Sequence, residues 1–356
     1  MINALPDSPL DIIGDVHGEN AALEHLLFNL GYQLDGYHPR GRKLVFVGDL
    51  FDRGPNSPAV LNIVRAIIEA GNGQLVLGNH ELNLLRGKRK DGNDWFWDES
   101  LARDGKYEPY ARLSPAQRTE LFELLSQMPL ILQRDDIRIV HAAWHDPSLD
   151  KLKRAPQLPV EDLFDQWDKQ VDVALANEGL LQQSQDELDI WLHALEDKAQ
   201  KVPLLKAVGL CDERKQMDNP LRVLSSGFER LASAPFFSSG KWRFASRVKW
   251  WDEYQSDVPV IIGHYWRQFQ PVDRKALGKG DSYLFSDVEP THWLGARGNV
   301  FCVDFSVGGR FQERSAGKSP GASTKLAALQ WPERTLVLDT GERVATGGFG
   351  ETSTYQ

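Results

Sequence analysis

The sequence has few cysteines, no long apolar run and no excess of positive charge. Its two cysteines, Cys211 and Cys302, lie far apart and form no C-x-x-C pattern, which argues against a disulfide framework or a zinc ribbon. No apolar stretch approaches the roughly 20 residues that a membrane span requires. The formal net charge of -9 provides no global positive field to attract nucleic acid or anionic lipid. An anionic substrate must therefore be attracted by local charges.

The start of the chain, MINALPDSPLDIIGD, lacks a basic segment followed by an apolar core. It therefore predicts no signal peptide, and we expect a cytoplasmic protein. The apolar content of 41% and the charged content of 26% are typical of a soluble globular protein.

Three similar segments lie within the first 80 residues. LDIIGD, KLVFVGD and QLVLGN are each an apolar run that ends in glycine followed by aspartate or asparagine. Helical spacing of apolar residues follows each run, over residues 21–30, 58–70 and 80–85. This alternation predicts parallel strands whose carboxyl ends meet at one edge of a sheet.

Polar side chains with metal-binding or proton-transfer chemistry follow these three strands. One aspartate after a strand is commonly only a turn former or a helix cap. Turn chemistry alone, however, requires neither the histidine in Asp-Val-His nor the sequence Asp-x-x-Asp-Arg-Gly. We therefore expect six side chains to converge at the sheet edge: Asp15, His17, Asp49, Asp52, Asn79 and His80.

These residues carry a resemblance to a known family. GDVHG, GDLFDRG and GNHE resemble three signature blocks of the calcineurin-like metallophosphoesterases, in the phosphoprotein-phosphatase branch. IRIVHAAW, VPVIIGHYW and NVFCVDFSVGG extend the match, which looks closer to bacterial serine/threonine or tyrosine phosphatases and diadenosine tetraphosphatases. The resemblance implies an α/β, four-layer fold in which two facing mixed β-sheets are flanked by helices.

The resemblance also implies a centre with two divalent metal ions. Its six ligands would be Asp15 and His17 for the first ion, Asn79, His141 and His264 for the second, and Asp49 for both. Carboxylate, imidazole and amide oxygen ligands suit Mn²⁺, which we expect, as well as Fe or Zn²⁺. The implied reaction is attack of a metal-bridging hydroxide on a phosphate ester.

Further roles follow from the same resemblance. His80 would be the general acid for the leaving group, and Asp52 would accept its other N–H. Arg53, together with Asn79, would bind the phosphate oxygens.

The sequence departs from the protein phosphatases at Leu77, where that branch usually carries a second phosphate-binding arginine. Another cation is then needed, and the candidates are Arg243 and Arg247. We favour Arg247, because a short segment connects it to the strand that precedes His264. The alternative is a surface arginine paired with Asp252 or Glu253.

The chain is predicted to form one metallophosphoesterase domain over residues 1–342, with a helical insert at 156–243. The insert is either a cap near the active-site mouth or a packing decoration far from it. Residues 343–356 are rich in glycine and threonine and are expected to be disordered.

Two aromatic segments leave alternatives open. RGKRKDGNDWFWDE could form a nucleic-acid stacking platform, but we favour cations that complement a helix C-terminus. In KWRFASRVKWWDEY, Trp250 and Trp251 either line the cleft or belong to the core.

Hydrolysis of phosphate monoesters, as in protein phosphatases, is the leading functional hypothesis. The enzyme alternative is hydrolysis of dinucleoside polyphosphates of the diadenosine tetraphosphate type. A hypothesis of another class is a catalytically silent phosphate-binding scaffold. The complete ligand set together with His80 and Asp52 argues against silence, since a binding module needs no proton donor. The expected partner is a phosphorylated protein or small phosphate ester, and neither membrane nor nucleic acid is expected.

Overall fold

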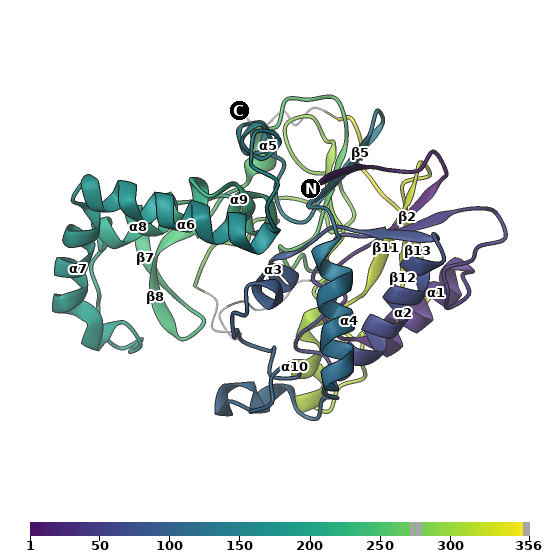
Figure 1. The fold of residues 1–356 in the computed structure, drawn as a ribbon, viewed down its shortest axis with the longest axis horizontal. Helices are drawn as coiled ribbons and strands as arrows, with labels where there is room; N and C mark the ends of the chain where they lie inside the picture. Colours follow the sequence, from purple (N-terminus) through teal and green to yellow (C-terminus); the bar gives the residue numbers. More distant parts are fainter. Residues whose placement is uncertain (271–273, 275–279, 352–356) are drawn as a thin grey trace. The chain divides into compact units, whose positions relative to one another are not determined.

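A computed structural model describes residues 1–270, 274 and 280–351. The described chain divides into two compact units (Figure 1). Of the described residues, the first unit comprises 1–144, 251–270 and 288–351, and the second comprises 145–250, 274 and 280–287. All residues proposed as metal ligands belong to the first unit.

The first unit contains a six-stranded mixed sheet that carries the three repeated segments. Strands β2, β3 and β4 run parallel, whereas β11, β12 and β13 are antiparallel to their neighbours. The order across the sheet is β13 (Arg343–Ala345), β12 (Thr335–Leu338), β11 (Ala327–Trp331), β2 (Leu10–Ile13), β3 (Lys43–Phe46) and β4 (Gly73–Leu75).

A helix follows each of the three parallel strands, as the spacing of apolar residues predicts. These helices are α1 (Asn20–Leu30), α2 (Ser57–Glu69) and α3 (Asn79–Leu85). The Asn56 side chain caps α2 by accepting from the Ala59 backbone N–H at 3.0 Å. The apolar face of α1 is buried and packs against β12, so helices flank this sheet.

A five-stranded mixed sheet faces the first one across a shared apolar core. Its order is β1 (Ile2–Ala4), β5 (Ile131–Arg134), β6 (Ile137–Val140), β9 (Val260–Ile262) and β10 (Val300–Cys302). Ile12 and Val45 of the first sheet lie in one buried cluster with Leu132, Ile139 and Ile261 of the second. The predicted fold of two facing mixed sheets flanked by helices is therefore confirmed.

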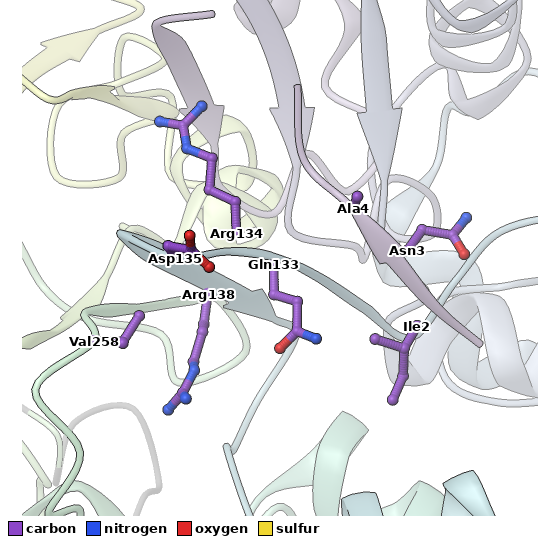
Figure 2. A pocket seen from close by; sticks show the side chains of 8 residues that line it. All are labelled: Ile2, Asn3, Ala4, Gln133, Arg134, Asp135, Arg138 and Val258. Atoms are coloured by element: carbon purple, nitrogen blue, oxygen red, sulfur yellow. The ribbon is translucent and has the colours of Figure 1, made fainter. Parts of the chain in front are cut away.

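A hollow of about 460 Å³ lies beside β1, β5 and β6. Figure 2 shows Gln133 and Arg138 pointing to one side of the strands and Arg134 to the other. Arg138 donates to the Tyr254 hydroxyl at 2.7 Å and lies over the Trp144 ring. None of the residues lining this hollow is a predicted site residue.

The remaining helices of the first unit lie outside these repeats. They are α4 (Pro115–Ser126) and α10 (Arg310–Ser315), with 3₁₀ turns at Ala102–Tyr107 and Val307–Gly309 and a third, Trp250–Asp252, at the junction of the units. Among the described residues, no helix is both long and apolar enough to span a bilayer.

The described part of the second unit is helical apart from one antiparallel hairpin. It contains α5 (Asp146–Lys153), α6 (Val160–Asn177), α7 (Leu180–Trp191), a 3₁₀ turn (Leu192–Ala194), α8 (Lys206–Met217), α9 (Pro220–Ser226), β7 (Glu229–Ser238) and β8 (Lys241–Arg247). α8 packs closely on the hairpin, since a Cβ at Gly209 would lie 2.5 Å from the Leu231 side chain. The predicted insert, residues 156–243, lies inside this larger unit.

The tail differs from the expectation of disorder from residue 343. β13 pairs with β12, and the Phe349 ring packs against Trp293 at 4.7 Å between centroids. Gly350 donates its backbone N–H to the Gly298 carbonyl. Pairing with distant segments therefore orders residues that the composition predicts to be disordered. Residues 352–356 lie outside the described residues.

Trp250 and Trp251 are each only 2% exposed. Trp250 packs with Phe228, and Trp251 packs edge-on against Tyr265 at 5.4 Å. This burial favours the core interpretation of both side chains.

Candidate metal centre

The backbone turns sharply where the predicted site residues follow their strands. Non-glycine residues rarely adopt a positive φ, and such strain concentrates at functional sites. His17, Asp49 and His264 have φ values of 47°, 49° and 69°. Six of the nine described non-glycine residues with positive φ are in or beside the candidate centre: His17, Asp49, Asp52, Arg53, His264 and Trp266.

One group of potential ligands forms around His17. Its Nε2 lies 3.9 Å from Asp15 Oδ2 and 4.0 Å from Asp49 Oδ2. His80 Nε2 lies 3.8 Å from the same oxygen of Asp49. His17, Asp49 and His80 are all buried and offer ligand atoms within 4.8 Å of one another. Strands β2 and β3 thus bring together residues that are distant in sequence.

A second group of potential ligands also includes Asp49. His141 Nε2 lies 3.3 Å from both Asp49 Oδ2 and Asn79 Oδ1. His264 Nδ1 lies 2.9 Å from Asn79 Oδ1. Asp49, His141 and His264 again offer ligand atoms within 4.8 Å of one another. Asp49 therefore belongs to both groups.

Hydrogen bonds orient two of the imidazoles toward the centre. His17 Nδ1 donates to the Phe51 carbonyl at 3.1 Å, and His141 Nδ1 donates to the Val47 carbonyl at 2.7 Å. In each ring the other nitrogen, Nε2, faces the carboxylates described above and is the one that could bind a metal ion in the neutral imidazole.

The loop that carries Asp49 is held by Glu81. The buried Glu81 carboxylate accepts the backbone N–H groups of Asp49 at 2.8 Å, Leu50 at 2.9 Å and Gly78 at 2.9 Å. Burial and the Asp49 charge raise the pKa of Glu81 to about 7. Glu81 therefore fixes the end of β3 relative to the start of α3.

The donor set and its spacing fit divalent cations. Metal–ligand distances of about 2.0–2.2 Å place neighbouring ligand atoms about 3.0–3.5 Å apart. The second group, at 2.9 to 3.3 Å, is close to this spacing, whereas the first group is wider, at 3.8 to 4.0 Å. Burial and the Asp304 charge raise the pKa of Asp15 well above its usual range. Burial lowers the pKa of His141, but the Asp49 carboxylate outweighs burial and raises it to about 10. Buried carboxylates this close together favour a bound cation.

His80 lies beside this centre and is held through its Nδ1. Its Nδ1 hydrogen-bonds to Asp52 Oδ2, and its Nε2 points to the Asp49 side. The ring packs edge-on against His17 at 4.9 Å. The other oxygen of Asp52 accepts from the Trp95 indole N–H at 2.5 Å.

Arg53 approaches the centre from the loop after β3. Its Nη1 lies 3.0 Å from His17 Nε2, and its guanidinium lies 4.9 Å from the centre of the Trp266 ring. The lone pair of His17 Nε2 can be given either to Arg53 or to a metal ion. The Trp266 backbone is held by Asp304, whose carboxylate accepts its N–H at 2.7 Å.

Arg247 belongs to the second unit, unlike the other predicted site residues. It lies at the end of β8, opposite Glu229 of β7. The pKa of Glu229 is raised by burial, an effect that the Arg247 charge opposes. The role of Arg247 and its alternative pairing with Asp252 or Glu253 both stay predictions.

Sequence reasoning missed several residues that shape the centre. Glu81 stands in the GNHE motif, where its two backbone-binding oxygens could not be foreseen from a single sequence. Asp304 follows the apolar run VFCV directly, without the glycine that precedes Asp15 and Asp49. Trp95 lies in a loop that joins α3 to α4, so no periodicity links it to Asp52.

The comparisons with known proteins agree with this geometry. A model of the calcineurin-like phosphoesterase family matches residues 8–203. An asymmetrical bis(5'-nucleosyl)-tetraphosphatase, PrpE, from Geobacillus sp. (strain WCH70) is 34% identical over an alignment of 144 residues that covers 37% of this chain and 56% of the relative. A symmetrical bis(5'-nucleosyl)-tetraphosphatase from Janthinobacterium sp. (strain Marseille) is 29% identical over 71% of this chain and 81% of the relative.

A solved structure is also similar to this chain. The cold-active protein-tyrosine phosphatase of a Shewanella species matches 97% of this chain and 82% of its own, with a TM-score of 0.42 and 15% identity.

The two facing sheets and the histidine–carboxylate centre define a metal-dependent phosphoesterase fold. The chain belongs to the calcineurin-like phosphoesterase family, a family of hydrolases that act on phosphate esters with divalent metals. The resemblance seen in the sequence is thereby confirmed. The chain spans about half the length of the first of these relatives, 56%.

Proposed function

We propose that this chain is a dinuclear-metal-dependent hydrolase that cleaves dinucleoside polyphosphates such as diadenosine tetraphosphate. The observation that carries the proposal is the pair of ligand groups that share Asp49. The substrate class is supported by the two curated relatives, both bis(5'-nucleosyl)-tetraphosphatases. They favour the alternative from the sequence analysis over its leading hypothesis of phosphate monoesters.

The metal ligands proposed are the six from the sequence: Asp15, His17, Asp49, Asn79, His141 and His264. When bound, two divalent ions supply an activated water molecule and neutralise charge on the phosphoryl oxygens. The oxygen and nitrogen donors suit Mn²⁺, with Fe and Zn²⁺ as alternatives.

The residues around the ions bind the substrate and move a proton. Arg53 offers a planar fork of N–H donors to the phosphate oxygens. His80 gives a proton from Nε2 to the leaving oxygen, while Asp52 holds the Nδ1–H. A nucleotide is a better leaving group than a serine alkoxide, so this proton transfer matters less for an anhydride than for a phosphoserine ester.

The test compares substrates on one preparation. Metal-stripped protein is reloaded with Mn²⁺, and kcat/KM is measured for diadenosine tetraphosphate, a phosphoserine peptide, a phosphotyrosine peptide and p-nitrophenyl phosphate. We expect diadenosine tetraphosphate to exceed both peptides by at least about tenfold, a difference of about 1.4 kcal/mol in transition-state binding. Chromatography of the products then distinguishes two ADP molecules from ATP plus AMP.

The opposite ranking overturns the substrate class. A higher kcat/KM on either phosphopeptide returns the chain to the protein-phosphatase hypothesis. No turnover of any substrate with Mn²⁺, Fe²⁺ or Zn²⁺ leaves the silent phosphate-binding scaffold as the better account.

A further inference from the structure

The Asp52 carboxylate has two different hydrogen-bond donors, one on each oxygen. Oδ2 is hydrogen-bonded to His80 Nδ1, and Oδ1 accepts from the Trp95 indole N–H at 2.5 Å. Asp52 is 0% exposed and Trp95 is 2% exposed, so solvent cannot substitute for either donor. The Asp52 backbone is held separately, because its N–H donates to Ser57 Oγ at 3.1 Å. The hydrogen bonds that link His80, Asp52 and Trp95 thus form a buried, continuous series.

The Trp95 indole is a donor whose direction is fixed, so it can hold the Asp52 carboxylate in one orientation. Trp Nε1–H only donates, so it cannot take the place of Asp52 as the acceptor of the His80 N–H. The ring cannot easily turn, because it packs against Phe51 at 5.6 Å and Phe96 at 6.0 Å between centroids. The direction of the N–H is therefore set by packing.

The loop that carries Trp95 is itself anchored. The buried Asp104 accepts the backbone N–H groups of Gly92 at 3.0 Å and Asp94 at 3.1 Å. The Trp95 carbonyl accepts from the Leu113 backbone N–H. Gly92 also accepts the Arg53 backbone N–H at 2.8 Å, so the same loop contacts the phosphate-binding segment. This loop is the NDWFW segment for which the sequence left two other interpretations open.

We propose that Trp95 is a positioning residue of the proton donor. Its N–H fixes the Asp52 carboxylate, which in turn fixes the ring of His80 so that Nε2 faces the leaving oxygen. The inference rests on the role of His80 in the proposed function. If Trp95 were only structural, its N–H would still donate to Asp52, but the hydrogen bond would have no effect on proton transfer by His80.

The chain offers a matched control. Trp331 also donates its indole N–H to an aspartate carboxylate, Asp136 Oδ2, at 2.7 Å. It is 6% exposed and lies in the apolar core between the sheets. Trp331→Phe therefore removes the same kind of hydrogen bond with the same change of side chain, but away from His80.

The experiment measures kcat on two aryl phosphates with Mn²⁺-loaded protein. Phenyl phosphate needs protonation of its leaving oxygen, whereas p-nitrophenyl phosphate does not. We expect Trp95→Phe to lower kcat about 10- to 100-fold on phenyl phosphate and less than about threefold on p-nitrophenyl phosphate, with KM nearly unchanged. Trp331→Phe should stay within about twofold on both substrates. In the His80→Ala background, Trp95→Phe should add little, because the two residues act as one unit.

Equal losses on both aryl phosphates, or full additivity with His80→Ala, would overturn the proposal and leave Trp95 as a packing residue. If Trp95→Phe does not fold, the Trp95 indole ¹⁵N–¹H resonance is compared in the parent and His80→Ala proteins. A shift at Trp95 with none at Trp331 supports the proposal, and no shift at Trp95 overturns it. A parent that hydrolyses both aryl phosphates but not diadenosine tetraphosphate refutes the proposed substrate class without touching the inference about Trp95.

Discussion

At the scale of single residues, Asp49 has the most constrained surroundings in the candidate centre. Its Oδ2 lies 3.3 Å from His141 and 4.0 Å from His17, and its backbone N–H is held by Glu81. Burial raises the pKa of Asp49, but the imidazoles of His141 and His80 outweigh it and hold that pKa well below the usual range. The carboxylate is therefore ionised and available to two cations.

Asp49→Asn should lose both bound metal and activity. One neutral amide oxygen cannot neutralise two divalent ions, and its NH₂ would face the imidazoles. We expect elemental analysis to find fewer than two metal ions per chain and kcat/KM to fall at least about 10³-fold. An active Asp49→Asn protein with two ions per chain would refute the bridging role.

His80→Ala tests proton transfer separately from metal binding. We expect kcat to fall about 10²- to 10⁴-fold on poor leaving groups and much less on p-nitrophenyl phosphate. Metal content should survive, and elemental analysis on the same samples checks it. Equal losses on both classes of substrate would mean that His80 orients or ligates and does not donate a proton.

The residues at the three strand ends were predictable, whereas their supports were not. Asp15, Asp49 and Asn79 follow apolar runs in one repeated pattern, and parallel strands must bring such positions together. Trp95 and Asp304 contact the site only through folding of distant segments. Their partners are set by tertiary packing, which no local spacing in a single sequence encodes.

At the scale of elements, α10 holds the segment that leads into β11. Glu313 of α10 accepts the backbone N–H groups of Gly321 at 2.8 Å, Ser323 at 2.7 Å and Thr324 at 2.9 Å. Burial raises the pKa of Glu313, but these hydrogen bonds and that of the Ser323 hydroxyl outweigh it and leave the pKa below its ordinary value. The carboxylate therefore stabilises the fold in its ionised form.

Glu313→Gln should destabilise the protein by about 1–3 kcal/mol at pH 7, because an amide NH₂ cannot accept where two carboxylate oxygens did. A depressed pKa adds stability above the unfolded-state pKa, and this stability is lost as the pH falls through the folded-state pKa. The difference between Glu313→Gln and its parent should thus shrink in acid. Urea unfolding at pH 7, and again below the pH range in which glutamate ordinarily titrates, measures the free energy of unfolding of both proteins. The exposed Glu123→Gln is the control, and a loss that does not change with pH would contradict the account.

The hairpin β7–β8 carries the prediction for Arg247. Leu77, which stands where protein phosphatases carry a second arginine, is buried and offers no charge to a substrate. If Arg247 supplies that charge, Arg247→Ala should lower kcat/KM about 10- to 100-fold, as expected for one lost charge-assisted hydrogen bond. Arg230→Ala, on the neighbouring strand, is the control. Kinetics of Arg247→Ala within twofold of the parent would exclude Arg247 from substrate binding.

At the scale of the whole molecule, the class of fold was easier to predict from the sequence than the limits of the helical insert and of the ordered C-terminal segment. Repeated strand–helix segments predicted the parallel part of the first sheet, because local spacing and topology agree there. The second unit is larger than the predicted insert, since it also includes residues 145–155 and 244–250. The ordering of Phe349 against Trp293 depends on residues some 50 positions apart, which composition does not reveal.

Substrate choice also belongs to the whole molecule. The proposed metal ligands and the proposed acid His80 would serve hydrolysis of either an ester or an anhydride, so the centre alone does not select between the two substrate classes. The curated relatives favour dinucleoside polyphosphates, and the substrate panel with Mn²⁺ decides the question independently of any single side chain.

The central claim is that Asp49 joins two metal sites, and anomalous X-ray diffraction from Mn²⁺-loaded crystals tests it most directly. Data collected at the manganese absorption edge should show two peaks on opposite sides of Asp49 Oδ2, about 3.5–4 Å apart. One peak should lie between Asp15 and His17, and the other among Asn79, His141 and His264. A single peak, or two peaks that do not share Asp49, would contradict the account.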